Sequence, residues 1–299
     1  MLSKKKTKKI FLIILLAIIL IGGYLIFANR VAIRGWFDLW YRKSTLPPAQ
    51  EFSPIKIEAV KNSAASSVNQ KEETQKQSPI PANLQTDIII TPPPSTASSS
   101  VQDSLQENVL PMEINLAVPF VSQAPFKNWD ALHEETCEEA SAVMINGFYT
   151  SVKVYTRGQM EDELQKIVDW ENINFGFFED TTAEETVQFI KAIYGLNAVV
   201  KYDITLDDIK QTLASDQPVI VPAAGKLLPN PYFSNGGPLY HMLVVKGYTK
   251  DGKFITNDPG TNTLGENFTY KFDDLYNAIH DWVKSGDVLT GRKAMIVVE

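Results

Sequence analysis

The stretch HEETCEEASAVMINGFY, residues 133–149, carries the chain's single cysteine at the start of a predicted helix. Its small and apolar side chains recur with helical spacing after the cysteine, at Ala140, Val143, Met144, Gly147 and Phe148. Thr136 is a suitable N-cap, so Cys137 is expected in the first helical turn. The dipole and the unpaired N–H groups of a helix N-terminus lower the pKa of a thiol. This position therefore favours a reactive cysteine.

The alternative interpretation of Cys137 is a buried structural cysteine. A single cysteine excludes an intramolecular disulfide. Glu138 and Glu139 disfavour a thiolate by charge repulsion, although acidic residues also suit a helix N-terminus. The local sequence leaves both interpretations open.

Two later segments offer a base and a group to orient it. His241 lies at the start of the apolar segment YHMLVVKGY, residues 240–248, and Asp258 precedes the final proline of KFITNDP, residues 253–259. The turn Asp251-Gly252 predicts that these segments form a hairpin, where Asp258 can fix the tautomer of the imidazole. The alternatives are a packed histidine and an ordinary turn aspartate before proline, with Asn257 as a competing orienting group.

Gln123 ends the segment INLAVPFVSQ, residues 114–123, which is predicted to be a strand. Its amide could form an oxyanion hole together with the backbone N–H of Cys137. A glutamine at a strand end is weak evidence alone. The order Gln, Cys, His, Asp in contexts of strand, helix N-terminus, strand and strand is, however, the order of papain-like cysteine peptidases.

Four segments carry a resemblance to a known family: VPFVSQAPFKNWD, TCEEASAVM, GGPLYHMLVVKGY and FITNDPGT. The chain resembles the double-glycine leader peptidase-like (C39-like) group of papain-fold cysteine peptidases. The resemblance implies Cys137 as nucleophile, His241 as base, Asp258 as orienting group and Gln123 as oxyanion donor. Many members have glycine where this chain has Glu138. True leader peptidases are fused to transporter domains, so leader processing for export is not the expected task.

The remaining pattern of residues 113–299 predicts an α+β domain in which helices come first and strands mostly later. Its sheet is expected to be antiparallel. Helices are predicted at 137–150, 157–171, 182–194, 205–215 and 273–284. Thr181 and Glu184 suggest a capping box for the third. Further strands are predicted at 197–204, 218–223, 268–272 and 293–298.

The N-terminus predicts a membrane anchor. A lysine-rich tail, residues 1–9, precedes the apolar run 10–28, which would span about 28 Å as a helix. This run exceeds a typical signal-peptide core, so an uncleaved transmembrane helix is favoured. The lysines favour a cytoplasmic N-terminus and an extracytoplasmic domain, whereas Arg30, Arg34, Arg42 and Lys43 partly oppose that orientation. Residues 29–112 are expected to be a juxtamembrane segment and then a disordered tether rich in Ser, Thr, Gln and Pro.

Other features limit the functional classes. The net charge of −7 gives no general attraction to nucleic acid. No metal-ligand or phosphate-loop motif occurs, so no cofactor is expected. Trp129, Asn128 and Tyr240 are candidates to line a substrate groove, and His133 is expected in the cleft wall.

These observations together predict an extracytoplasmic thiol peptidase acting on peptides or proteins. Two alternatives remain. The same triad can serve a cell-wall amidase or transpeptidase, because one acyl-enzyme reacts with either water or an amine. Alternatively, the chain is a non-catalytic surface binding module, which Glu138 favours.

Overall fold

An antiparallel sheet forms the core of the computed structural model, which describes residues 4–52 and 110–299. The strand order is β2-β7-β3-β4-β5-β6, and β1 pairs with β4 beside this path. The strands are β1 (Ile114–Asn115), β2 (Ala198–Tyr202), β3 (Val219–Ala223), β4 (His241–Tyr248), β5 (Lys253–Asn257), β6 (Phe268–Lys271) and β7 (Ala294–Val298). All residues of β3, β4 and β7 are buried, which agrees with their continuous apolar sequences.

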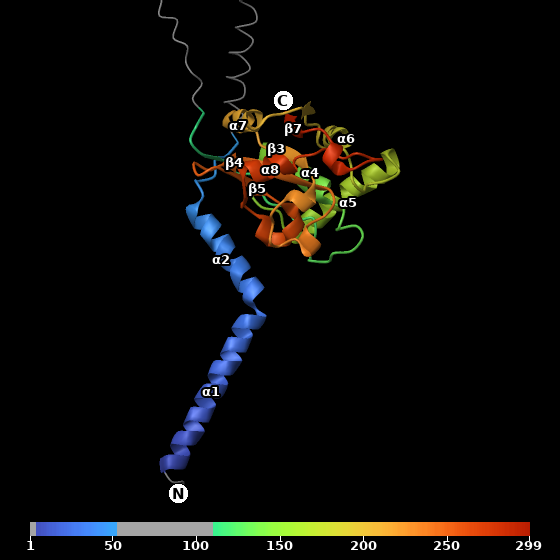
Figure 1. Cartoon of the computed structure of the whole chain (residues 1–299). Helices are drawn as coiled ribbons and strands as arrows, with labels where there is room; N and C mark the ends of the chain where they lie inside the picture. The colour runs from blue at the N-terminus through green and yellow to red at the C-terminus, as the bar shows by residue number, and fades with distance from the viewer. Residues whose placement is uncertain (1–3, 53–109) are drawn as a thin grey trace, which may run out of the picture. The chain divides into compact units, whose positions relative to one another are not determined.

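Five helices pack around this sheet: α4 (Cys137–Tyr149), α5 (Arg157–Asn174), α6 (Ala183–Tyr194), α7 (Leu206–Ala214) and α8 (Phe272–Ala278). The helix α4 contacts β3 and β4 as well as α5 and α6, and it lies beside α5 in Figure 1. Eleven of its thirteen residues are buried. The helix that carries Cys137 is therefore a central element of the core. The predicted α+β class with an antiparallel sheet is confirmed.

The N-termini of α5, α6 and α7 are fixed by capping boxes. The box predicted for α6 was wrong by one residue, because Thr182 and Glu185 form it. Thr181 is fully buried instead, and its N–H donates to the Glu138 carboxyl at 3.1 Å. The residue before the α6 cap therefore contacts the residue that follows the cysteine.

Two predicted elements are shorter than expected. The strand expected at 114–123 is regular only at Ile114–Asn115. Beyond it, Pro119 has no N–H, and the carbonyl groups of Val118 and Pro119 accept from the side chain of Asn257 instead of a neighbouring strand. The helix expected at 273–284 ends at Ala278, because the next residues pair in extended form with β3.

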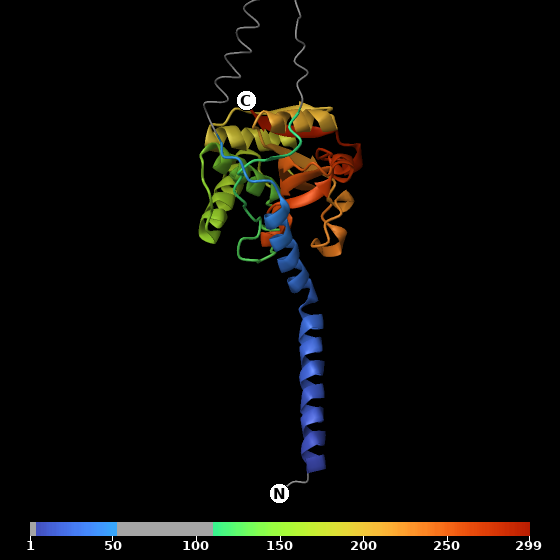
Figure 2. The same cartoon turned by 90° about the vertical axis from the view of Figure 1, so that its left-hand side faces the viewer.

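Two helices precede the domain: α1 (Lys4–Ala28) and α2 (Arg30–Thr45), both blue in Figure 2. Within the described residues, no helix taken alone meets the length and hydropathy needed to cross a membrane. The pair Ile14–Ala28 and Arg30–Thr45, bent by 65°, meets both criteria together. The predicted span 10–28 is thus helical, and its insertion in a membrane stays a prediction.

Residues 46–52, here called the docked segment, lie against the domain. Gln50 donates its N–H to the carbonyl of Asn115 and accepts from Ala117 N–H, both at 2.7 Å. Phe52 packs against the rings of Phe148 and Tyr149. Part of the range expected as linker therefore belongs to the folded unit. The rest of that prediction, at 53–109, lies outside the described residues.

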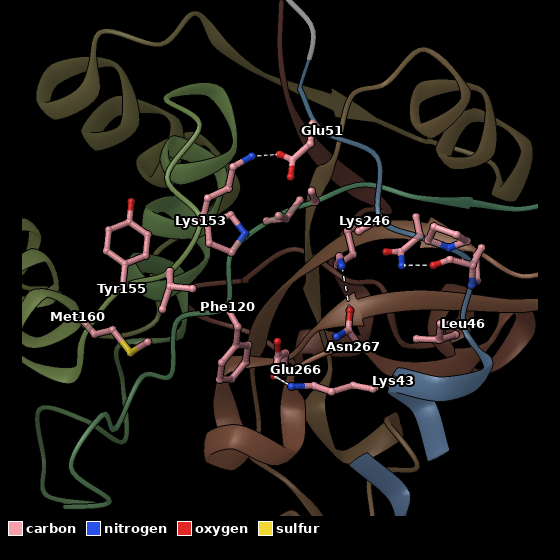
Figure 3. A pocket seen from close by; sticks show the side chains of 18 residues that line it. Lys43, Leu46, Glu51, Phe120, Lys153, Tyr155, Met160, Lys246, Glu266 and Asn267 are labelled. Atoms are coloured by element: carbon pink, nitrogen blue, oxygen red, sulfur yellow. Dashed lines mark hydrogen bonds and ion pairs between the residues drawn. The ribbon is translucent and has the colours of Figure 1, made fainter. Parts of the chain in front are cut away.

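The docked segment and the domain enclose a pocket of about 640 Å³, shown in Figure 3. Lys246, on β4, reaches into it and donates to Asn267 at 2.8 Å. Lys43 pairs with Glu266 at 3.1 Å, and Lys153 pairs with Glu51. Burial lowers the pKa of Lys246 to about 8.

Candidate active site

Cys137 occupies the first position of α4, with its thiol at the start of β4. The residue is buried, and its Sγ accepts a hydrogen bond from the backbone N–H of Met242 at 3.3 Å. This contact brings the neighbour of His241 directly to the sulfur, although the two residues are far apart in sequence. The α4 N-terminus and the β4 N-terminus therefore meet at the cysteine.

His241 and Asp258 form a buried pair on adjacent strands. His241 opens β4, and Asp258 follows β5, which is antiparallel to β4. The distance from His241 Nε2 to Asp258 Oδ1 is 2.9 Å, and both side chains are almost fully buried. A carboxylate only accepts, so Nε2 carries the proton. No partner for Nδ1 occurs among the residues that the structure describes, which leaves that nitrogen unpaired.

Asp258 receives three further hydrogen bonds. Gly260 N–H donates to Oδ1 at 3.0 Å, while Asn230 Nδ2 and Tyr270 O–H donate to Oδ2 at 3.0 and 2.6 Å. Burial alone would raise the pKa of Asp258, but the His241 charge and the hydrogen bonds from His241, Tyr270 and Gly260 outweigh it and hold the pKa below its usual value. The aspartate is therefore ionised and fixed in orientation.

Glu138 contacts the thiol directly. Cys137 Sγ donates to Glu138 Oε2 at 2.9 Å, and Glu138 Oε1 accepts the N–H of Thr181. Burial raises the pKa of Cys137 well above its ordinary value, and the Glu138 charge raises it further. Burial also raises the pKa of Glu138. The cysteine in this state is a neutral thiol, held by its neighbour's carboxyl.

The amide protons of Gln123 already have hydrogen-bond acceptors. Its Nε2 donates to the carbonyl oxygens of His133 and Glu134 at 2.9 and 3.2 Å. The Thr136 hydroxyl donates to the Gln123 carbonyl at 3.2 Å, which ties this loop to the start of α4. Thr136 is the N-cap residue of α4, and its side chain makes no cap bond. The role of Gln123 as oxyanion donor stays a prediction.

A pocket of about 750 Å³ opens onto these groups. Gln123, Cys137 and His241 line it. Of the three residues suggested for a substrate groove, Trp129 and Tyr240 line the pocket, and Tyr240 donates its O–H to the Thr181 carbonyl at 3.1 Å. Asn128 is not in the lining, and it bonds Asp130 at the surface.

His133 is not among the residues that line this pocket, and both of its ring nitrogens face carboxylates. Its Nδ1 lies 2.7 Å from Asp130 Oδ1, and its Nε2 lies 3.1 Å from the carboxyl of Glu161. Burial lowers the pKa of His133, but the bonds to Asp130 and Glu161 outweigh it and raise the pKa overall. This histidine therefore has a structural role in the loop before α4.

Two buried carboxyls of α4 and α5 lie beneath the site. Glu139 and Glu171 are fully buried, and no hydrogen-bond donor reaches their four oxygens among the described residues. Burial raises the pKa of Glu171 to about 9, and it raises the pKa of Glu139 as well. Burial therefore favours the protonated form of both carboxyls. No group of three His, Cys, Asp or Glu residues within 4–52 and 110–299 is placed to hold a metal ion.

Comparison with known proteins gives one family match and two similar structures. A family model described as the Peptidase_C39 like family matches residues 115–289. A structure from Bacillus anthracis, provisionally assigned as a C39-like peptidase, is 17% identical, with a TM-score of 0.40 over 62% of this chain and 97% of that chain. Interpain A, a cysteine protease from Prevotella intermedia, is 15% identical, with a TM-score of 0.28 over 52% of this chain and 62% of its own. No curated protein matches the sequence.

The family match covers more than half of the chain and includes the segments that bring Cys137, His241 and Asp258 together. This chain belongs to the Peptidase_C39 like family and is a cysteine peptidase.

Proposed function

We propose that this protein hydrolyses peptide bonds outside the cytoplasmic membrane through a triad of Cys137, His241 and Asp258. The observation that carries the proposal is the junction of α4 and β4. There the Cys137 sulfur accepts from Met242 N–H at 3.3 Å, while the adjacent His241 bonds Asp258 at 2.9 Å. A nucleophile at a helix N-terminus, an oriented imidazole and an open pocket are the requirements of thiol acyl transfer.

The unpaired nitrogen of His241 gives it the role of base. Since Asp258 holds the proton on Nε2, Nδ1 is the nitrogen able to take the thiol proton. The thiolate then attacks the carbonyl carbon, and the imidazolium returns the proton to the leaving amine. Water attacks the acyl-enzyme in the second half of the reaction and releases the acid, with His241 again as base.

The charge on the carbonyl oxygen needs donors during this attack. The first N–H groups of a helix have no partner within the helix, so the Cys137 N–H at the start of α4 is one donor. Gln123 is the second donor in our proposal. Gln123 lines the pocket, and its amide would have to exchange a bond with the carbonyl of His133 or Glu134 for one with the substrate.

We also propose that residues 10–28 anchor the chain in the membrane, with residues 1–9 cytoplasmic and the domain outside. Support comes from the apolar run inside α1 and from the lysines that precede it. Tagging either end of the chain and digesting intact cells with an external protease tests this. Protection of the N-terminal tag together with loss of the C-terminal tag is expected, and the reverse pattern would refute the orientation.

Hydrolysis is tested by incubating the full chain with a peptide library and, separately, with peptidoglycan fragments. We expect cleaved peptides from wild type and none from Cys137→Ala or His241→Ala. Cleavage confined to peptidoglycan fragments would indicate an amidase. Products joined to an added amine would indicate a transpeptidase. The absence of any thiol-dependent product would refute the enzymatic proposal.

A further inference from the structure

The helix α2 contacts the domain at the loops that border the candidate active site. Arg42 is buried although it is charged, and its Nη2 donates to the carbonyl of Leu264 at 2.7 Å. Gly35 is buried on the same face two helical turns earlier, where a Cβ atom would meet the Leu264 side chain at 3.0 Å. Asp38 accepts the hydroxyl of Tyr232. Arg42, Gly35 and Asp38 thus form one contact face on α2.

The first connection runs through the loop Pro259–Gly265, which Arg42 holds at Leu264. This loop supplies the Gly260 N–H that donates to Asp258 Oδ1. The other end of the loop also bonds Asp258, whose backbone N–H donates to the carbonyl of Gly265 at 3.0 Å. A side chain at Gly265 would overlap the Asp258 carbonyl, so the loop has no room to shift there.

The second connection runs through the loop after β3. Asp38 holds the hydroxyl of Tyr232, and the Tyr232 N–H donates to Asn230 Oδ1 at 3.0 Å. The amide of Asn230 then donates to Asp258 Oδ2 at 3.0 Å. Both ends of the Asn230 side chain are therefore fixed, one of them by α2.

The third connection runs through aromatic rings. The Arg42 guanidinium lies 5.0 Å from the centroid of the Phe268 ring, within the range of a cation–π contact. Phe268 packs on Tyr270 with centroids 4.8 Å apart, and Tyr270 donates its O–H to Asp258 Oδ2. Besides His241, Asp258 has three donors: Asn230 and Tyr270 contact side chains that α2 holds, and Gly260 lies in the loop that Arg42 holds.

We infer that α2 is a positioning element for the Asp258–His241 pair, and that Arg42 and Asp38 act as positioning residues through the donors to Asp258. The inference rests on the proposed triad. The helix also reaches the pocket itself, since Val31 is part of the same lining as Cys137 and His241. The N-terminal region is therefore a component of the active site as well as a connection to the predicted anchor.

The test uses the full chain with Arg42→Ala, its conservative partner Arg42→Lys, and Arg30→Ala as the matched control. Arg30 is an exposed arginine of the same helix whose contacts stay with Phe27. Three readouts are compared: alkylation of the single cysteine by iodoacetamide across pH 4–10, the NMR titration of the His241 ring, and kcat/KM on a cleaved peptide. The chain has three histidines, so His241→Ala assigns the ring signal.

We expect Arg42→Ala to reduce kcat/KM at least about tenfold, because small displacements of a catalytic pair cost one to two orders of magnitude. It should also shift the His241 titration and slow alkylation near pH 7. Arg42→Lys should be intermediate, and Arg30→Ala should match wild type. Asp38→Ala breaks the second connection and should shift the His241 titration in the same direction, which covers the case that Arg42→Ala does not fold.

A His241 titration that is the same in wild type, Arg42→Ala and Asp38→Ala would overturn the inference. Failure of the proposed function is distinguishable from this result. If His241→Ala leaves alkylation unchanged and no peptide is cleaved, the triad is refuted. The His241 titration of the α2 variants still reports whether the helix positions the pair.

Discussion

Replacing Glu138 by glutamine should make Cys137 more reactive at low pH. The substitution keeps the size of the side chain and removes the charge that the thiol contacts at 2.9 Å. An amide can still accept the Thr181 N–H with its oxygen, and its NH₂ group can then donate to the sulfur. The variant thus replaces a repulsive neighbour of the thiolate by a donor.

The size of the effect follows from the contact distance. Two like charges 2.9 Å apart repel by about 6 kcal/mol at an effective dielectric constant of about 20, or about four pKa units. Burial raises the pKa of Glu138 and so favours its neutral form, which makes the full repulsion an upper bound. We therefore expect Glu138→Gln to lower the pKa of Cys137 by about one to three units.

The assay is the rate of iodoacetamide alkylation of the full chain from pH 4 to pH 10, which follows the thiolate of the only cysteine. Glu139→Gln is the matched control, because Glu139 is also buried in the first turn of α4 but makes no hydrogen bond with the sulfur. An alkylation midpoint that stays at the wild-type pH in Glu138→Gln, or moves upward, would refute the reasoning that the carboxyl keeps the thiol neutral.

Three further perturbations test other parts of the structure. Tyr270→Phe removes the 2.6 Å donor to Asp258 and should therefore raise the pKa of that carboxyl. The acid limb of the pH–rate profile should then move to higher pH by about half to one unit, and a limb at the wild-type pH would contradict this. Burial raises the pKa of Glu171 from 4.5 to about 9. The folded state then binds more protons, and stability should fall as pH rises through this window. Urea unfolding should show that slope in wild type and a flatter one in Glu171→Gln. Burial lowers the pKa of Lys246 from 10.5 to about 8, so Lys246→Met should raise the free energy of unfolding at pH 7 by about 1–2 kcal/mol. That gain should shrink above pH 8, and a loss of stability at pH 7 would contradict the assignment.

The regular elements could be predicted from sequence because their signals are local. The apolar spacing after Cys137 gave the helix that begins there, and the Asp251-Gly252 turn gave the pairing of β4 with β5. Gly252 has a φ of 84°, which is the conformation that such a turn requires. The adjacent strands then explain why His241 and Asp258 could be expected to meet.

The surroundings of the candidate site could not be predicted, because they depend on contacts between distant segments. Asn230 lies in a loop of glycines and prolines, and Tyr270 alternates with polar residues in β6, yet both donate to Asp258. Only the register of β5 with β6 brings Tyr270 to that side chain. The direction of the Glu138 carboxyl toward the thiol depends likewise on Thr181, whose position follows from the start of α6.

The contacts of the N-terminal region with the domain could not be predicted from local sequence either. The composition of this region separates apolar helix from polar linker, but composition contains no information on where a segment docks. Gln50 pairs with Asn115 and Ala117, and Arg42 reaches Leu264, through partners that are distant in sequence. A boundary based on composition therefore assigned residues 46–52 to the linker, although they contact the domain.

The contacts of the docked segment determine how cleavage of the backbone would affect the folded unit. Phe52 and Leu110 flank residues 53–109 and belong to the same folded unit. In terms of connectivity, two separate stretches of the sequence, one ending at Phe52 and one beginning at Leu110, build one fold. A single proteolytic cut within residues 53–109 is therefore expected to give two fragments that remain associated through the backbone bonds of Gln50 and the rings around Phe52. The same geometry makes the protein a candidate for expression as two separate chains that assemble into one active site.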